Sequence, residues 1–131
     1  MIGQSIILEA VLLFGISVSI FLLCQSLFLS NEEYIRNQVE TNQLEMVKNN
    51  IVAMIYTIAN NPTDINISID IPQRVGETTY VIILSGKNIK LESAKYKTET
   101  TLNINYDMSG QATSFLGKLE LKKTENKIFI E

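Results

Sequence analysis

Apolar residues are concentrated near the N-terminus, where residues 6–29 form one nearly continuous apolar segment interrupted mainly by Glu9 and Gln25. A helix rises about 1.5 Å per residue, so this segment reaches about 36 Å and exceeds the roughly 30 Å hydrocarbon core of a bilayer. A cleaved secretory signal is disfavoured, because no Lys or Arg precedes Arg36 and the run is longer than the usual apolar core of about 7 to 15 residues. The segment is therefore predicted to be a helix that either anchors the chain in a membrane or is buried in an assembly.

A second helical pattern follows the apolar segment. Apolar residues recur at spacings of three, four and seven, which predicts an amphipathic helix with one buried stripe. The stripe consists of Tyr34, Ile35, Val39, Met46, Val47, Ile51, Met54, Ile55 and Ile58. The opposite, solvent-facing side is predicted to carry Arg36, Glu40, Glu45 and Lys48. We expect the part of the stripe from Met46 to Ile58 to pack against a β-domain.

The limits of this helix are also marked in the sequence. Ser30 followed by Glu33 has the spacing of a capping box, so the helix is expected to bend or restart near Ser30. Asn60-Asn61-Pro62 is expected to end it, because proline lacks the amide hydrogen and restricts the residue before it. The predicted helical element thus runs from about residue 5 to residue 59.

Six short strands are predicted after Pro62. Residues 65–71 alternate strictly between isoleucine and a polar residue, which is typical of a strand with one buried face. The other predicted strands are residues 79–84, 89–96, 100–108, 118–123 and 127–130. Their connections are too short for crossover helices, which predicts an antiparallel sheet or a small β-sandwich.

These patterns together predict an α+β fold with three parts. Residues 1–30 are expected to form a hydrophobic assembly or transmembrane helix. Residues 31–61 are expected to continue it as an amphipathic helix that packs on the β-domain, and residues 62–131 are expected to form that antiparallel domain.

Composition narrows the chemistry that the chain can perform. There are 11 Lys and Arg residues against 14 Asp and Glu, giving a net charge of −3, so the basic excess of a nucleic-acid-binding protein is missing and no nucleic-acid partner is expected. The sequence has no His and a single Cys, which excludes Ser-His-Asp catalysis and ordinary zinc sites. Cys24 lies in the apolar segment and is interpreted as a small apolar side chain. We therefore expect no enzymatic activity, no cofactor and no catalytic or metal-binding residue.

The polar residues of the predicted β-domain are mostly interpreted as surface. Asp64 and Asp70 are expected on the solvated side of the first strand. Five lysines with glutamates among them are interpreted as protection of sheet edges against aggregation: Lys90, Lys95, Lys97, Lys122 and Lys123. Asn66-Ile67-Ser68 is the one N-glycosylation sequon, and its asparagine is expected to point outward, so Asn66 is a candidate glycosylation site.

Glu9 is the most informative residue of the apolar segment, because a carboxylate in an apolar helix costs several kcal/mol unless it is near the interface or has a partner. Two interpretations remain open. In the first, Glu9 is close enough to the start of the helix to lie at the depth of the lipid headgroups. In the second, it pairs with the N-terminal amine of a neighbouring copy inside a bundle of such helices.

Gly3-Gln4-Ser5, followed by Glu9 and the apolar run from Ala10 to Phe14, resembles the N-terminus of archaeal type IV pilin-like proteins, which carry a class III type of signal peptide. In that family a prepilin-type peptidase cuts after a glycine and a glutamate lies a few residues inside the helix. The resemblance implies that Gly3 and Gln4 flank the processing site and that Glu9 is the assembly carboxylate. It also implies an apolar assembly surface, which consists of Ile6, Leu8, Val11, Leu12 and Phe14.

On this resemblance, the chain is expected to be a structural subunit of an extracellular type IV pilus-like filament. The subunit would be inserted in the cytoplasmic membrane before assembly and would then polymerise with copies of itself through the N-terminal helix, with the β-domains outside. An alternative is a permanently membrane-anchored envelope protein whose β-domain binds a surface partner, in plan resembling the stator proteins of the archaellum. The two hypotheses differ in whether the helix packs against many copies or stays in lipid.

Overall fold

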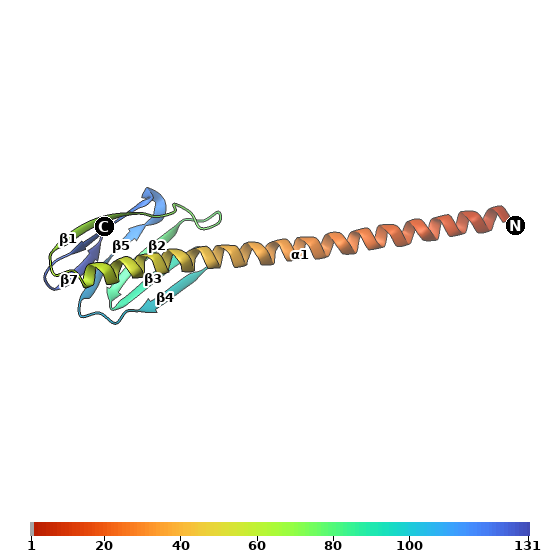
Figure 1. Cartoon of the computed structure of the whole chain (residues 1–131). Coiled ribbons are helices and arrows are strands. Elements are labelled where there is room, and N and C mark those ends of the chain that lie inside the picture. Colours follow the sequence, from red (N-terminus) through yellow and green to blue (C-terminus); the bar gives the residue numbers. More distant parts are fainter. Residues whose placement is uncertain (1) are drawn as a thin grey trace. The chain divides into compact units, whose positions relative to one another are not determined.

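The computed structural model describes residues 2–131 and contains one long helix, α1 (Ile2–Ala59), followed by a seven-stranded sheet (Figure 1). The predicted α+β fold is confirmed. The chain divides into two compact units, one extending to Asn37 and the other comprising Gln38–Glu131. Helix α1 therefore contributes its first part to one unit and its second part to the other.

Helix α1 continues through Ser30 without interruption, so the predicted bend or restart there is wrong. Neither Gly nor Pro occurs between Ile16 and Ala59. An ion pair of 3.4 Å joins Glu32 to Arg36 one turn later, in the spacing that stabilises helices. The local capping preference of Ser30 does not outweigh these helix-favouring neighbours. The predicted C-terminal end is confirmed at Ala59, shortly before Pro62.

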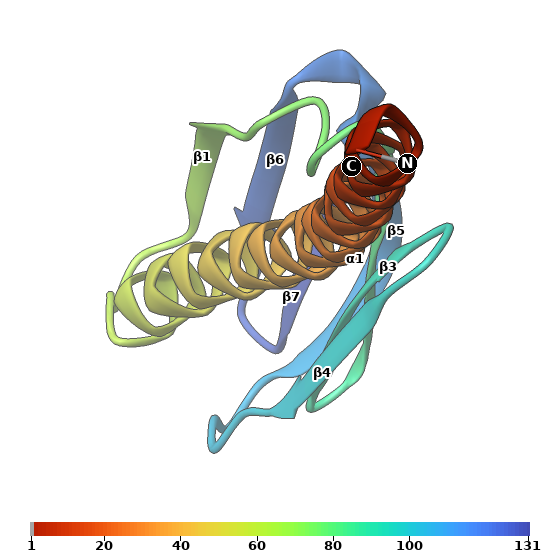
Figure 2. The same cartoon turned by 90° about the vertical axis from the view of Figure 1, so that its right-hand side faces the viewer.

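The seven strands form a single sheet in the order β1-β6-β7-β5-β2-β3-β4, so β1 and β4 are its edges (Figure 2). The strands are β1 (Ile65–Asp70), β2 (Tyr80–Gly86), β3 (Asn88–Ser93), β4 (Lys97–Thr101), β5 (Asp107–Thr113), β6 (Lys118–Lys123) and β7 (Lys127–Ile130). A short 3-10 turn, η1 (Ser114–Leu116), connects β5 to β6.

The predicted strand at residues 100–108 is wrong. Its alternating apolar residues include Leu102 and Ile104, which are buried in an irregular connection between β4 and β5. The alternation therefore reports burial and not strand pairing. Strand β5 was missed because its sequence, Asp-Met-Ser-Gly-Gln-Ala-Thr, has low β-propensity and is held in the middle of the sheet by its neighbours.

The prediction of a purely antiparallel sheet is also wrong for one pair of strands, because β5 and β7 run parallel. The β6–β7 hairpin lies between β1 and β5, with β6 against β1, and this places β7 beside β5. Gly110 permits the contact: it has a φ of +122°, and a Cβ at this position would lie 2.5 Å from the carbonyl oxygen of Ile130. The remaining pairs between neighbouring strands of residues 65–130 are antiparallel.

The core of the second unit is formed by one stripe of α1 and one face of the sheet. The stripe consists of Leu44, Val47, Ile51, Ile55 and Ile58, and residues such as Ile82, Leu91, Leu121 and Ile128 cover it from the sheet. The predicted stripe is therefore right from Val47 onward but wrong at its first four residues: Tyr34, Ile35, Val39 and Met46 are exposed, Met46 by 56%. At 100° per residue, Met46 lies on the other side of the helix from this stripe.

Three charged residues that were predicted at the surface are buried: Glu40, Lys48 and Lys123. Glu40 precedes Leu44 by four residues and Lys48 follows it by four, so both lie on the core stripe of the helix. Lys123 donates a hydrogen bond to the carbonyl oxygen of Asn61, and its ammonium lies 4.8 Å from the centre of the Tyr106 ring. The position of each residue in the helix or strand repeat therefore decides that it is buried, although its side chain is charged.

Candidate functional site

The apolar part of α1 is an exposed surface in the part of the chain that the structure describes. Between Ile2 and Leu29, large apolar side chains are 40 to 81% exposed. The helix contains an 18-residue window that is apolar enough to cross a membrane and is 0% buried. Soluble domains do not normally leave so long an apolar surface in water, so it requires lipid or another protein.

The predicted assembly residues all lie on this surface. Ile6, Leu8, Val11, Leu12 and Phe14 are each more than half exposed, and Phe14 is among the most exposed of them. Glu9 is exposed within the same helical segment. The structure therefore brings the predicted residues together on one element, although they form a surface and not a pocket.

Hydroxyl groups in the apolar segment are satisfied inside the helix. The Oγ atoms of Ser17 and Ser19 donate hydrogen bonds of 2.8 Å to the carbonyl oxygens of Leu13 and Gly15. Each serine consequently needs no donor or acceptor from lipid or from a neighbouring protein. Glu9, in contrast, is the one charged side chain among residues 2–31 and makes no ion pair in the part of the chain that the structure describes.

The two residues of the predicted processing site, Gly3 and Gln4, lie in the first turn of α1. An added Cβ at Gly3 would have no heavy atom within 4 Å among the described residues, so packing does not demand glycine at this position. The first turn of a helix also has few hydrogen bonds to hold it, because its amide groups have no partners within the helix.

The candidate glycosylation residue, Asn66, lies on edge strand β1 with its side chain exposed. The isoleucines on either side of it, Ile65 and Ile67, are only partly exposed, so the predicted alternation of the strand is confirmed. Asp64 and Asp70 are both exposed, as predicted, but Asp64 precedes the strand.

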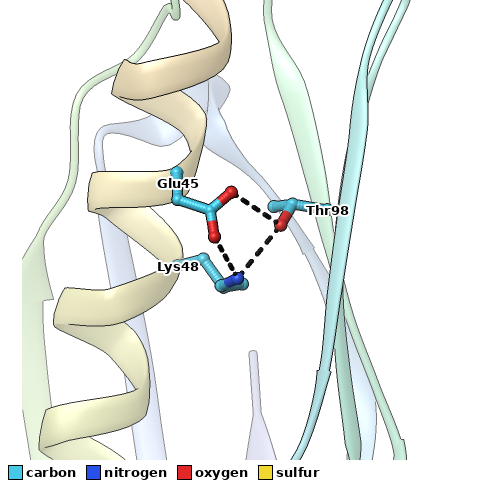
Figure 3. Close-up of polar contacts among 3 residues, drawn as sticks. All are labelled: Glu45, Lys48 and Thr98. Atoms are coloured by element: carbon cyan, nitrogen blue, oxygen red, sulfur yellow. Dashed lines mark hydrogen bonds and ion pairs between the residues drawn. The ribbon is translucent and has the colours of Figure 1, made fainter.

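A polar cluster that the sequence did not reveal joins α1 to β4. The ammonium of Lys48 donates to Glu45 Oε1 at 2.7 Å and to Thr98 Oγ1 at 3.1 Å, and the Thr98 hydroxyl donates to Glu45 Oε2 at 3.3 Å (Figure 3). Hydrogen bonding to Lys48, together with its charge, lowers the pKa of Glu45. Thr98 follows Glu45 by 53 residues, and its contact with the helix depends on strand pairing that single-sequence patterns do not contain.

This cluster does not have the arrangement of a catalytic pair. A threonine hydroxyl next to a lysine could act as a nucleophile and base only if the amine were free to accept a proton. Here Lys48 uses its ammonium protons to donate to both neighbours, and Glu45 compensates its charge. The cluster is better suited to tether the helix to the edge strand. Among residues 2–131, no three Asp, Glu, His or Cys side chains gather as a metal-binding group.

An apolar groove lies between the second part of α1 and edge strand β1. Its volume is about 340 Å³, and its lining includes Met46, Met54, Ile69, Ile71 and Pro72. Two further exposed apolar residues, Phe115 and Leu116, lie in η1 at the end of the sheet. No family model, curated protein or solved structure matches this chain.

Proposed function

We propose that this chain is a structural subunit of an extracellular type IV pilus-like filament. In such a filament the apolar parts of the helices form the core and the β-domains form the outer surface. The observation that carries this proposal is the unburied apolar surface of α1 from Ile2 to Leu29, attached to a β-domain that has a core of its own.

The same apolar surface serves two purposes under this proposal. Before assembly it holds the subunit in the cytoplasmic membrane, and after assembly it is buried against other copies. Burying one Leu, Ile or Phe side chain stabilises an assembly by about 1.5 to 3 kcal/mol relative to water. Transfer from lipid to protein gains much less, so packing and polar contacts between helices must supply the preference for the filament.

Glu9 is the residue that we expect to supply such a polar contact. A prepilin-type peptidase that cuts between Gly3 and Gln4 would remove the leader and create an N-terminal amine on Gln4. In the filament this amine would lie close to the Glu9 carboxylate of a neighbouring copy. An ion pair between that amine and Glu9 would neutralise both charges inside the apolar core. The peptidase and the other copies of the chain are thus the proposed partners.

The alternative is an envelope protein that is permanently anchored by the same helix and binds a surface partner through its β-domain. The length and composition of α1 support this function equally, because they suffice for a membrane span. It requires neither processing after Gly3 nor a role for Glu9. Those two residues therefore distinguish the two functions.

The experiment that tests the filament compares Glu9→Leu with the matched control Glu33→Leu, which removes an exposed carboxylate outside the apolar segment. We expect Glu9→Leu to leave the protein in the membrane with its β-domain folded, but to remove it from the material sheared off the cell surface. Electron microscopy of that material and mass spectrometry of the N-terminus provide the measurement. Normal filaments from Glu9→Leu, or an unprocessed chain confined to membranes, would favour the anchored protein.

The outward position of Asn66 supports a second, smaller proposal, that this residue is glycosylated at the cell surface. Intact-mass measurement of the native protein would show the added glycan, and Asn66→Gln would remove it. A native mass equal to that of the polypeptide would contradict the proposal.

A further inference from the structure

The two edges of the sheet differ in how well they are protected from another strand. Strand β1 pairs with β6 on one side and β4 pairs with β3, and within residues 65–130 neither has a partner on its other side. Edge strands usually carry lysine, proline or a bulge that prevents pairing with another chain. Strand β4 has Lys97 and Glu99, which limit its pairing to strands of matching charge, whereas β1 reads Ile-Asn-Ile-Ser-Ile-Asp and has no such residue before its end. Strand β1 is thus an open pairing edge.

The strand directions determine which edge of another copy can pair with β1. Across the sheet from β1 to β4, five neighbouring pairs of strands are antiparallel and one pair is parallel. Each antiparallel pair reverses the strand direction and five is an odd number, so the two edge strands run in opposite directions. When two copies point the same way, β4 of one copy is therefore antiparallel to β1 of the other. We propose that edge strand β1 pairs with β4 of a second copy, which joins the two β-domains into one continuous sheet.

The charges at the two edges favour one register. Placing Asp70 opposite Lys97 brings opposite charges together on the outer face, and Asp70 has no ion pair in the described part of its own chain. The remaining facing pairs are Ile69 with Thr98, Ser68 with Glu99, Ile67 with Thr100 and Asn66 with Thr101. Half-buried isoleucines then face half-buried threonines, and exposed residues face exposed ones. Such matched cross-strand pairs stabilise a sheet.

Neighbouring registers are less favourable. A shift of one residue would place the isoleucines of β1 opposite Lys97 and Glu99, so that apolar and polar faces no longer match. A shift of two residues in one direction places Asp70 opposite Glu99, which is a repulsive pair of like charges. The shift of two in the other direction leaves Lys97 opposite Ser68 and moves part of β4 beyond the end of β1. The charge pattern thus selects a single alignment.

This contact uses different patches on the two copies, so it can repeat without closing into a dimer. It rests on the proposed function in one respect, because a filament supplies copies that all point the same way. The second strand would lie beside the apolar groove between α1 and β1, with the side chains of Thr98 and Thr100 on the same face as those of Ile67 and Ile69. The outer surface of the filament would then include a continuous band of strands.

The test introduces one cysteine on each edge, Ser68→Cys and Glu99→Cys, into the full-length chain with Cys24→Ser. Residues directly opposite in an antiparallel pair have Cα atoms about 4.5 to 5.5 Å apart, within the range of a disulfide. We expect oxidation to give a ladder of dimers, trimers and longer chains in a denaturing gel. Each single-cysteine variant should stay monomeric. The pair Ser68→Cys with Thr101→Cys, displaced by two residues, should cross-link at least about fivefold less, because diagonal positions lie about 7 to 8 Å apart.

A charge exchange tests the register separately. In the double-cysteine chain, Asp70→Lys should lower the rate of cross-linking by about fivefold, because an attractive pair becomes a repulsive one. Adding Lys97→Asp should restore the rate. Glu125→Lys makes the same charge change in the exposed turn between β6 and β7 and should have no effect. No rescue by the second substitution would refute this register.

The outcomes separate this contact from the filament itself. Filaments that form normally but give no ladder would refute the edge contact and leave the proposed function intact. A ladder from chains that stay in the cell membrane and form no filaments would support the contact and refute the filament. Dimers from Ser68→Cys alone would show that β1 pairs with another β1, which contradicts the proposal.

Discussion

The two parts of α1 carry similar apolar side chains but have different surroundings. Phe14, Phe21 and Phe28 are each about 70% exposed, whereas Ile51, Ile55 and Ile58 are almost completely covered by the sheet. Hydrophobicity therefore does not by itself tell where the core lies. The second part of the helix is stabilised by the fold of its own chain, and the first part gains stability only from a membrane or from other molecules.

The largest expected difference between the two parts comes from removing one large side chain in each. Ile55→Ala leaves a cavity beneath the sheet and should lower the free energy of unfolding by about 2 to 5 kcal/mol. Phe21→Ala removes a side chain that contacts no core residue and should leave unfolding of the β-domain unchanged. Urea denaturation of the full-length chains in detergent, followed by circular dichroism, measures both. Equal losses would show that the apolar part of α1 is coupled to the core.

Two glycines extend the comparison to the backbone. Gly110→Ala should destabilise the protein by about 1 to 3 kcal/mol, because alanine resists a φ of +122° and its Cβ would collide with the Ile130 carbonyl oxygen. Gly15→Ala should instead stabilise the helix by about 1 kcal/mol, because alanine is the better helix former. An added Cβ at Gly15 would have no heavy atom within 4 Å among the described residues. Thermal unfolding of the β-domain measures the first effect, and helix content from far-ultraviolet circular dichroism measures the second. A destabilised Gly15→Ala chain would imply a contact at that position.

A smaller effect is expected at Glu40, where the second part of α1 enters the core. The Oε2 atom of this buried carboxylate has no hydrogen-bond partner among the described residues. Because an unpaired buried acceptor is costly, Glu40→Met should raise the free energy of unfolding by about 1 kcal/mol. The exposed Glu33→Met should have almost no effect. A loss of stability in Glu40→Met would instead assign Glu40 a specific role in holding the loop near Gly76.

The sequence was sufficient to predict features that depend on local periodicity. It revealed the apolar segment, the helix end before Pro62 and the alternation in β1. It was insufficient where distant residues decide the structure. The low β-propensity of β5 is outweighed by pairing with β2 and β7, and Thr98 lies beside Lys48 because β4 pairs with β3. The burial of Glu40 and Lys48 was available in the sequence, because both follow the spacing of the core stripe.

The smallest expected effect concerns the polar cluster of Glu45, Lys48 and Thr98. The pKa of Glu45 is lowered in the folded protein, so its interaction with Lys48 stabilises the fold when the pH is above the unfolded pKa of about 4.5. This contribution is lost as the pH falls through the lowered pKa of the folded state. Glu45 is half exposed, so solvent screening keeps the effect small.

Lys48→Met removes the ammonium but keeps a long apolar side chain in the buried position. Glu45 is half exposed, so water solvates its carboxylate once the partner is gone, and such a partly exposed ion pair contributes little to stability. At pH 7 the variant should therefore unfold at almost the same urea concentration as the unaltered chain. Its stability should decline less between pH 5 and pH 3, because Glu45 then has an ordinary pKa in both states. Urea midpoints measured across this range give the comparison, with Lys95→Met, which removes an exposed lysine between β3 and β4, as the control. Identical pH profiles for Lys48→Met and the unaltered chain would mean that the tether contributes to geometry and not to stability.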